Sequence, residues 1–306
     1  MNKEFPLVSV IVITYNSAKT VLETLESIKN QTYKNIELII SDDCSKDNTV
    51  EICKKWINEY GCEFVHSEII TVSKNTGTAG NLNRGFKSSQ GIWIKSIAGD
   101  DVLMNNCIES NINYIYNNSK TEILLSKVKP LGENYKLKKY KDLFNYGALK
   151  LTSRELLYLL LAKNFLPAST LFIKKHTFEE LGGYEESIPL LEDWPFWIKA
   201  LYNNKSISFN NDYTVYYRMS ESSISLSNSP SPLYQKSLDI FYTNFLNEYR
   251  YKTNKLLWFY FENNKWRVGK PLFLKIFSKI LDLINPMRFY LKSLEKKSQY
   301  LYSKGK

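Results

Sequence analysis

The chain has 306 residues, of which 43% are hydrophobic, so it can bury one large core or two smaller ones. Its formal net charge of +10 is concentrated at one end, because residues 250–306 hold 14 of the 41 basic residues and 3 of the 31 acidic ones. The chain has only two histidines, which argues against a histidine-rich zinc site. Its four cysteines form no CxxC pair, which predicts reduced thiols in a cytoplasmic chain. The sequence pattern predicts neither a signal peptide nor a membrane-spanning segment.

Strands and helices alternate through the first third of the chain. A continuous apolar run rich in β-branched residues predicts a strand buried on both faces at residues 7–13. Similar runs predict strands at 36–40 and 92–98, and a weaker strand is predicted at 63–71. Amphipathic periodicity predicts helices at residues 18–30, 49–60, 81–89 and 104–116. This alternation predicts an α/β fold with a mostly parallel central sheet and helices on both faces.

The second half of the chain is less regular. Residues 127–141 are predicted to form a lysine-rich loop, residues 166–173 a turn that leads into a strand of the sheet, and residues 213–217 a strand. Helices are predicted at residues 154–163, 178–181 and from 190 onward, with a loop or hinge at 220–232. We divide the chain into a unit at 1–225, with halves at 1–118 and 119–225, and a basic helical extension at 226–306.

Polar side chains follow three of the predicted strands at the point where each strand ends. They are Thr14, Tyr15 and Asn16 after the first strand, Asp42 and Asp43 after the second, and Asp100 and Asp101 after the fourth. In parallel sheets, ligands bind at the carboxyl ends of the strands. One acidic turn alone is commonly just a solvated turn, but three such turns on one edge predict a binding site.

The kind of ligand follows from what this edge contains. The sequence has neither the G-x-G-x-x-G pattern of dinucleotide sites nor a P-loop, and four carboxylates would repel a bare phosphate. A divalent cation removes that repulsion by lying between carboxylate and phosphate oxygens. Tyr15 can stack on a base and Asp43 can accept a hydrogen bond from a ring N–H. The edge therefore predicts a pocket for a nucleoside diphosphate held through Mg²⁺ or Mn²⁺.

Several segments resemble family 2 glycosyltransferases of the type that builds bacterial surface polysaccharides. Residues 8–16, 27–33 and 37–47 are similar to the opening of that family, and four later landmarks follow in order. These landmarks are Asn75-Thr76-Gly77, Asn83-Arg84-Gly85, the metal-binding region Ala98-Gly99-Asp100-Asp101, and the ED motif Glu192-Asp193-Trp194. The resemblance covers about residues 6–220.

The resemblance implies a GT-A fold at 1–225, a nucleotide-sugar donor with UDP as the expected nucleotide, and inversion at the anomeric carbon. It implies nucleotide-binding roles for Thr14, Tyr15, Asn16, Asp42, Asp43, Asn75, Gly77 and Asn83. By the same resemblance Asp100 would bind Mn²⁺ or Mg²⁺, Asp101 would lie near the donor sugar, and Asp193 with Glu192 would form the catalytic base. The chain departs from the family pattern at Ala98, where the first aspartate of the metal motif is expected, and at Leu82, where an arginine is common.

Two of these positions also have simpler interpretations. Glu192 and Asp193 precede Pro195 at the start of a predicted helix. An acidic residue at this position stabilises a helix by about 0.3–1 kcal/mol through its interaction with the helix dipole. A general base beside bulky aromatic residues is the functional alternative, which the upstream pattern favours. Arg218 can contact the diphosphate or pair with Glu221, and both remain open.

The C-terminal part changes character. A helix is predicted at 233–251, an aromatic cluster at 257–261, and a basic helix with a broad apolar face at 272–284. Residues 250–306 are therefore expected either to lie on an anionic membrane surface, at its cytoplasmic face, or to pack on the rest of the chain. The acidic sheet edge argues against a nucleic-acid partner.

The expected acceptor is a saccharide or a lipid-linked saccharide in polysaccharide or glycolipid assembly. Two other functions stay open from the sequence. A nucleotidyltransferase acting on sugar phosphates also uses carboxylates and a metal ion, but it needs a basic triphosphate-binding loop, which residues 14–17 do not form. A non-catalytic nucleotide-sugar-binding module is the other alternative.

Overall fold

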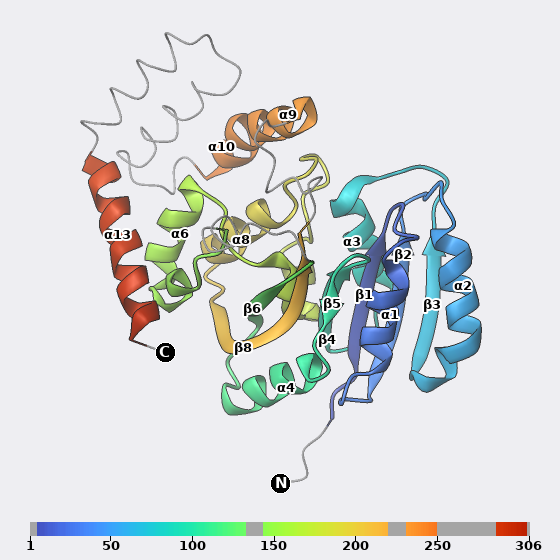
Figure 1. Cartoon of the computed structure of the whole chain (residues 1–306). Coiled ribbons are helices and arrows are strands. Elements are labelled where there is room, and N and C mark those ends of the chain that lie inside the picture. The colour runs from blue at the N-terminus through green and yellow to red at the C-terminus, as the bar shows by residue number, and fades with distance from the viewer. Residues whose placement is uncertain (1–4, 133–142, 220–230, 250–285, 305–306) are drawn as a thin grey trace.

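Eight strands form one mixed sheet in the order β3-β2-β1-β4-β7-β6-β8-β5 (Figure 1). The structure is a computed structural model that describes residues 5–132, 143–219, 231–249 and 286–304. The strands are β1 (Val8–Thr14), β2 (Ile36–Asp42), β3 (His66–Thr71), β4 (Trp93–Ala98), β5 (Val102–Leu103), β6 (Ile123–Leu131), β7 (Phe172–Lys174) and β8 (Ile207–Arg218).

Most strands of the sheet run in the same direction, as the sequence predicts. The pairs β1–β2, β1–β4, β2–β3 and β6–β8 are parallel, whereas β7 is antiparallel to both β4 and β6, and β5 is antiparallel to β8. Because β7 reverses direction between β4 and β6, those two strands point the same way. The carboxyl ends of β1, β2, β4, β6 and β8 therefore all meet one edge of the sheet.

Helices cover both faces of this sheet, which confirms the predicted α/β class. The longer helices are α1 (Val21–Lys29), α2 (Thr49–Tyr60), α3 (Gly77–Ser88), α4 (Cys107–Asn117), α6 (Ser153–Ala162), α8 (Asp193–Tyr202), α9 (Pro232–Ile240) and α13 (Pro286–Ser303). Shorter ones are η1 (Gly61–Glu63), η2 (Tyr146–Lys150), η3 (Ala168–Thr170), α7 (Lys175–Glu180), the π-helix η5 (Phe241–Phe245) and α10 (Leu246–Glu248).

Alternate side chains of β1 pack into two separate cores, as expected for a strand buried on both faces. Val8, Val10 and Val12 pack on one face with α1, α2 and α4, whereas Ile11 packs on the other face with α3, α6 and α8. All four side chains are fully buried. The β1 strand therefore cannot shift its register by one residue without exchanging the two cores.

Two local predictions were wrong. Residues 127–131, predicted as part of a lysine-rich loop, belong to β6, where a register irregularity around Lys127 interrupts the two-residue alternation that would have indicated a strand. The helix expected from residue 81 begins earlier, at Gly77, which has a φ of +81° and donates its amide N–H to Asp43. The strand expected at 213–217 begins six residues earlier, as β8 from Ile207 to Arg218, whereas the other predicted elements within the described residues lie within a few residues of their expected bounds.

The C-terminal helix α13 packs on α6 and η2 (Figure 1). Met287, Leu291 and Leu294 are buried in this contact, and Lys297 Nζ lies 2.7 Å from Glu155 Oε1 on α6. Of the two arrangements expected for residues 250–306, packing on the rest of the chain is therefore observed for one face of α13. The predicted segments at 257–261 and 272–284 lie outside the described residues. Within the described ranges, every helix is too short or too polar to traverse a bilayer.

Candidate functional site

The turns after β1, β2 and β4 adjoin one another, as predicted. Thr14 is the register partner of Asp42, and Ile13 is the partner of Ala98. Backbone hydrogen bonds continue this contact beyond the strands, since Asp43 N donates to Thr14 O at 3.0 Å and Gly99 N donates to Ile13 O at 2.9 Å. The predicted gathering of the polar turns at one sheet edge is therefore confirmed.

Asp42 joins the β1 turn to the β2 turn. Its carboxylate is fully buried and accepts hydrogen bonds from Thr14 Oγ1 at 2.8 Å and from the backbone and hydroxyl of Ser45 at 2.9 and 2.5 Å. Ser45 Oγ in turn accepts from Asn16 N at 2.8 Å. Tyr15, between these contacts, is 51% exposed, so its ring is accessible to a ligand, and Asn16 is exposed as well.

Asp43 holds the loop that begins α3. Its two oxygens accept hydrogen bonds from the backbone and hydroxyl of Thr76, from Gly77 N at 2.8 Å, and from Arg84 Nη2 at 3.0 Å. Burial acts to raise the pKa of Asp43, but these hydrogen bonds outweigh it and hold the pKa below its usual value. Asp43 is therefore ionised, and its position is fixed relative to Asn75, whose Oδ1 also accepts from Gly77 N.

The turn at Gly99-Asp100-Asp101 presents its two carboxylates to different environments. Asp101 is buried and accepts a hydrogen bond from Arg218 N at 2.8 Å. Burial, and then the charge of Asp100, raise the pKa of Asp101 to about 8. Asp100 itself is exposed. Thr20 and Thr24 on or next to α1 anchor the turn by donating to Gly99 O and Asp101 O, each at 2.7 Å.

Arg218, at the end of β8, is bound to this same turn. Its Nε donates to Asp100 O at 2.7 Å, and its guanidinium forms an ion pair with Glu23 on α1. Glu221, the alternative partner considered from the sequence, lies outside the described residues. The guanidinium is therefore beside Asp100, within the part of the sheet edge where a diphosphate is predicted.

Glu192 and Asp193 begin helix α8 as adjacent, partly buried carboxylates. Burial, and then the charge of Asp193, raise the pKa of Glu192 to about 7. Burial also raises the pKa of Asp193, against the opposing effect of a hydrogen bond from Asn164 Nδ2 to Asp193 Oδ2 at 2.8 Å. Two raised carboxyl pKa values side by side are typical of groups that exchange a proton during catalysis.

Asn83 connects α3 to the segment that leads into α8. Its Nδ2 donates to Tyr184 O at 3.0 Å and to Glu186 Oε1 at 2.7 Å, and its Oδ1 accepts from Tyr184 N at 2.9 Å. The charges of Glu192 and Asp193 act on the buried Tyr184 phenol and help to raise its pKa, after burial itself. Hydrogen bonds therefore link Asp43 through α3 to Tyr184 and Glu186, in the segment before α8.

The carboxylates at this edge are suited to a metal ion that bridges to a substrate. No cluster of three or more His, Cys, Asp or Glu side chains that could enclose a metal ion occurs among the residues that the structure describes. Mg²⁺ and Mn²⁺ bound to nucleotides commonly use one or two protein carboxylates and complete their coordination with phosphate oxygens and water. Asp100, exposed next to the buried Asp101, fits such an arrangement.

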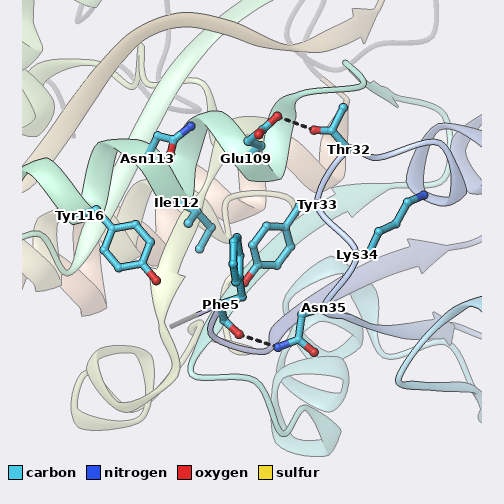
Figure 2. Close-up of a pocket in the computed structure, with 9 residues that line it drawn as sticks. All are labelled: Phe5, Thr32, Tyr33, Lys34, Asn35, Glu109, Ile112, Asn113 and Tyr116. Atoms are coloured by element: carbon cyan, nitrogen blue, oxygen red, sulfur yellow. Dashed lines mark hydrogen bonds between the residues drawn. The ribbon is translucent and has the colours of Figure 1, made fainter. Parts of the chain in front are cut away.

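A separate cavity lies at the opposite edge of the sheet, before β1 and β2 begin (Figure 2). It measures about 380 Å³ and is lined by Phe5, Thr32, Tyr33, Lys34, Asn35 and four residues of α4: Glu109, Ile112, Asn113 and Tyr116. Two hydrogen bonds cross its rim, from Thr32 to Glu109 at 2.7 Å and from Asn35 to Phe5 O at 2.6 Å. None of the predicted site residues contributes to this cavity.

Four further residues lie beside the predicted site residues, although the sequence patterns assigned them no role. Arg84 pairs with Asp43, and Lys95 lies fully buried behind the Asp101 turn with Nζ donating to Ser169 O at 2.6 Å. Asn164 and Tyr234 lie near Asp193. The signal for Lys95 in the sequence was a lysine within a largely apolar strand, because a buried ammonium group needs hydrogen-bond acceptors such as the Ser169 carbonyl.

A family model described as glycosyl transferase family 2 matches residues 9–182. An uncharacterized glycosyltransferase of Rickettsia felis is 28% identical over 66% of this chain and 32% of its own length. An Escherichia coli enzyme named as a UDP-Glc:α-D-GlcNAc-diphosphoundecaprenol β-1,3-glucosyltransferase is 31% identical over 72% of this chain and 80% of its own. The chain thus spans about a third of the Rickettsia felis relative, and 64% of another from Rickettsia prowazekii.

Two solved structures resemble this one over nearly its whole length. Staphylococcus aureus TarS 1–349 in complex with UDP-GlcNAc has a TM-score of 0.59 at 21% identity, covering 98% of this chain and 92% of its own. A Pyrobaculum calidifontis mannosyltransferase in complex with GDP-Man and Mn²⁺ has a TM-score of 0.57 at 14% identity, covering 99% and 87%. At these identities the likeness is one of fold.

Proposed function

Because the chain belongs to glycosyl transferase family 2 and has the GT-A fold, we propose that it transfers a sugar from a nucleoside-diphosphate sugar to an acceptor hydroxyl, with inversion at the anomeric carbon. The observation that carries this proposal is the sheet edge, where the turns bearing Asp43 and Asp100 flank the β1 turn and α3 is hydrogen-bonded to Tyr184, in the segment that leads into α8. UDP is the proposed nucleotide, since UDP-sugars are named for both the E. coli relative and the TarS complex.

The proposed reaction is a single displacement that needs few protein groups. The acceptor oxygen forms a bond to the anomeric carbon, its proton passes to the carboxylate of Asp193, and the bond from the anomeric carbon to the diphosphate oxygen breaks. Trp194 and Trp197 are buried next to Asp193 and limit access of bulk water on that side. A bound Mn²⁺ or Mg²⁺ would be held by Asp100 and would neutralise the charge that develops on the leaving diphosphate.

Residues 1–225 form the proposed catalytic unit, with residues 14–16, Asp42, Asp43, Asn75, Gly77 and Asn83 around the nucleotide and Asp101 near the donor sugar. Of these, Tyr15 is proposed to stack on the base, because it is the exposed aromatic side chain of its turn. Arg218 is proposed to add positive charge at the diphosphate. The proposed acceptor is a saccharide or lipid-linked saccharide, as the E. coli relative's named acceptor supports.

The nucleotidyltransferase alternative is disfavoured by the backbone after β1. A triphosphate-binding loop needs free amide N–H groups that point at the phosphates. Here Asn16 N donates to Ser45 Oγ at 2.8 Å, Ser17 N to Thr49 Oγ1 at 2.7 Å, and Ala18 N to Asp47 Oδ2 at 3.1 Å. These amides are therefore already engaged by side chains of the β2–α2 turn.

A thermal-shift panel of nucleotide sugars with Mn²⁺ tests the proposed function. We expect UDP-sugars to raise the unfolding temperature by several degrees, because a ligand at 100 times its Kd adds about 2.7 kcal/mol of stability. The stabilising donor should then release UDP slowly in water when Mn²⁺ is present. No shift with any UDP-, GDP- or dTDP-sugar would contradict a donor site, and a shift without UDP release would support the non-catalytic module.

We also propose that the C-terminal part of the chain contacts an anionic lipid surface. The exposed face of α13 carries Phe289, Lys292, Lys296 and Tyr300, which are spaced as one helical stripe, and the two aromatic side chains are 64% and 55% exposed. Basic residues between aromatic ones are typical of helices that lie in the membrane interface. The opposite face of α13 is the one buried on α6 and η2.

Flotation of the full chain with vesicles tests this proposal. We expect the chain to float with phosphatidylcholine vesicles that contain phosphatidylglycerol, and the double change Lys292→Gln and Lys296→Gln to weaken that binding roughly 30-fold, at about 1 kcal/mol for each lysine. Changing Lys54 and Lys55 on α2 to Gln is the matched control, since both are exposed on another helix. Equal flotation of wild type and the α13 variant would contradict the proposal.

A further inference from the structure

We infer that Asn164 holds the Asp193 carboxylate in the orientation and charge state that a base requires, and is thus a positioning residue for the transfer reaction. This inference rests on the proposed role of Asp193. Asn164 lies two residues beyond the end of α6, on a segment far from Asp193 in sequence, and it lies outside the family landmarks. Its importance follows from contacts at both ends of its amide.

The Asn164 amide is fixed by its own loop and directed at Asp193. Its Oδ1 accepts a hydrogen bond from Leu166 N at 3.4 Å, and its Nδ2 lies 2.8 Å from Asp193 Oδ2. These two contacts agree on which amide atom is oxygen and which is nitrogen, because only the nitrogen can donate to a carboxylate. Asp193 Oδ2 is therefore the oxygen that Asn164 holds.

A second hydrogen bond keeps the two segments together. Trp194, the residue after Asp193, donates its indole N–H to Leu160 O at 2.5 Å on the last turn of α6. The start of α6 is fixed by a capping box in which Thr152 and Glu155 bond to each other's backbone amide. The end of α6 and the beginning of α8 therefore behave as one unit, so that the Asn164 amide is already in place before an acceptor binds.

The titratable groups described around Asp193 carry no positive charge that would stabilise its carboxylate. Glu192 precedes it on α8, the Tyr184 phenol approaches from the segment before α8, and the Tyr234 phenol approaches from α9. Each is an acid that gains nothing from a neighbouring carboxylate, and burial further disfavours the charge. Among the effects that favour ionised Asp193, the hydrogen bond from Asn164 is the largest, followed by the backbone N–H of Trp194.

Removing this hydrogen bond therefore moves the ionisation of Asp193 to higher pH. A donor to a carboxylate stabilises the charged form, so its loss raises the pKa, and a single charge-assisted bond corresponds to a shift of about one pH unit. In Asn164→Ala, less Asp193 is ionised at any pH near neutrality. The acidic limb of the pH–rate profile should move upward by the same amount, while KM for the donor stays unchanged.

The test is a pH titration by NMR of the full chain labelled with ¹³C at the aspartate carboxyl carbons, with Asp193→Asn used to assign the signal. We expect the Asp193 midpoint to rise by about one unit in Asn164→Ala and in Asn164→Ser, whose hydroxyl is too short to reach. Asn203→Ala is the matched control, because Asn203 bonds to Lys199 O at the other end of α8. The rate of Mn²⁺-supported UDP release from UDP-glucose is measured over the same pH range.

An unchanged Asp193 midpoint in both folded Asn164 variants overturns the inference. A raised midpoint with no movement of the pH–rate profile also overturns it, because Asn164 would then affect Asp193 without affecting a base. If the wild type releases no UDP at all, the proposed function fails, whereas the NMR midpoints still show whether Asn164 controls Asp193. The two failures are therefore distinguishable.

Discussion

Replacing Asp193 by Asn is expected to lower the rate of sugar transfer by about 10²–10⁴-fold and to leave the affinity for UDP unchanged. The amide cannot take the proton from the acceptor hydroxyl, but it keeps the size of the side chain and an oxygen that accepts from Asn164. Because the β2 turn is held by its own hydrogen bonds from Thr14, Ser45 and Thr76, we expect the nucleotide contacts to be unaltered. Rates of UDP release and calorimetric UDP affinity, both with Mn²⁺, are the measurements.

The unfolding temperature of the Asp193→Asn variant shows whether Asp193 acts as a base or as a structural carboxylate. Burial raises the pKa of Asp193, so the folded protein carries its charge at a cost, and an uncharged amide should not lower the unfolding temperature. Asp212→Asn is the matched control, since Asp212 bonds to Ser110 at 2.7 Å, away from α8. Parallel loss of UDP affinity and of turnover in Asp193→Asn would mean that Asp193 supports the fold and not the chemistry.

Replacing Asp100 by Asn is expected to remove the part of the UDP affinity that depends on Mn²⁺, a loss of at least about 10²-fold. An amide oxygen carries no net charge and is a much weaker ligand for a hard cation, and even residues that only support metal ligands cost about 10–100-fold when changed. The turn itself should persist, because Thr20, Thr24 and Arg218 bind the backbone of Gly99-Asp100-Asp101 and the carboxylate of Asp101.

Calorimetry of UDP binding with Mn²⁺ and with EDTA measures this effect. Wild type should bind UDP tightly with Mn²⁺ and weakly with EDTA, whereas Asp100→Asn should bind weakly in both. Asp212→Asn again serves as the control and should match the wild type. A variant that keeps the full response to Mn²⁺ would show that other carboxylates hold the ion.

Local patterns were sufficient to predict the central sheet and the edge that carries the site. The strands β1, β2 and β4 are buried on both faces, so each is predicted by a run of consecutive, mostly apolar residues. Their carboxyl ends are aligned because parallel strands with helical connections leave little choice of register or edge. The acidic turns at Asp42, Asp43 and Asp100 could therefore be placed together from the order of strands and helices alone.

What each of these carboxylates does could not be predicted from the sequence. Asp42 and Asp43 are neighbours, yet Asp42 joins two turns and Asp43 holds the start of α3 through Thr76 and Arg84. Arg218 pairs with Glu23, which lies 195 residues earlier in the chain. Such contacts depend on how distant elements pack, and no periodicity or spacing reports on them.

The surroundings of Asp193 show the same limit. The ED motif identified the carboxylate pair, but Asn164 follows a leucine-rich helix whose sequence indicates only burial. β6 was missed for a related reason, because Lys127 and Lys129 lie in a strand whose alternation is interrupted. Residues such as Asn164, which come from the less regular half of the chain, are therefore not predicted by sequence patterns.

The central claim is that Asp100 and Asp193 serve a single donor site. A crystal structure of the chain with UDP and Mn²⁺, with the metal located by its anomalous scattering, tests it most directly. The account predicts the Mn²⁺ peak between Asp100 and the two phosphates, with the carboxylate of Asp193 facing the space beyond the terminal phosphate. Mn²⁺ and UDP bound away from Asp100, or Asp193 facing a different cavity, would contradict the account.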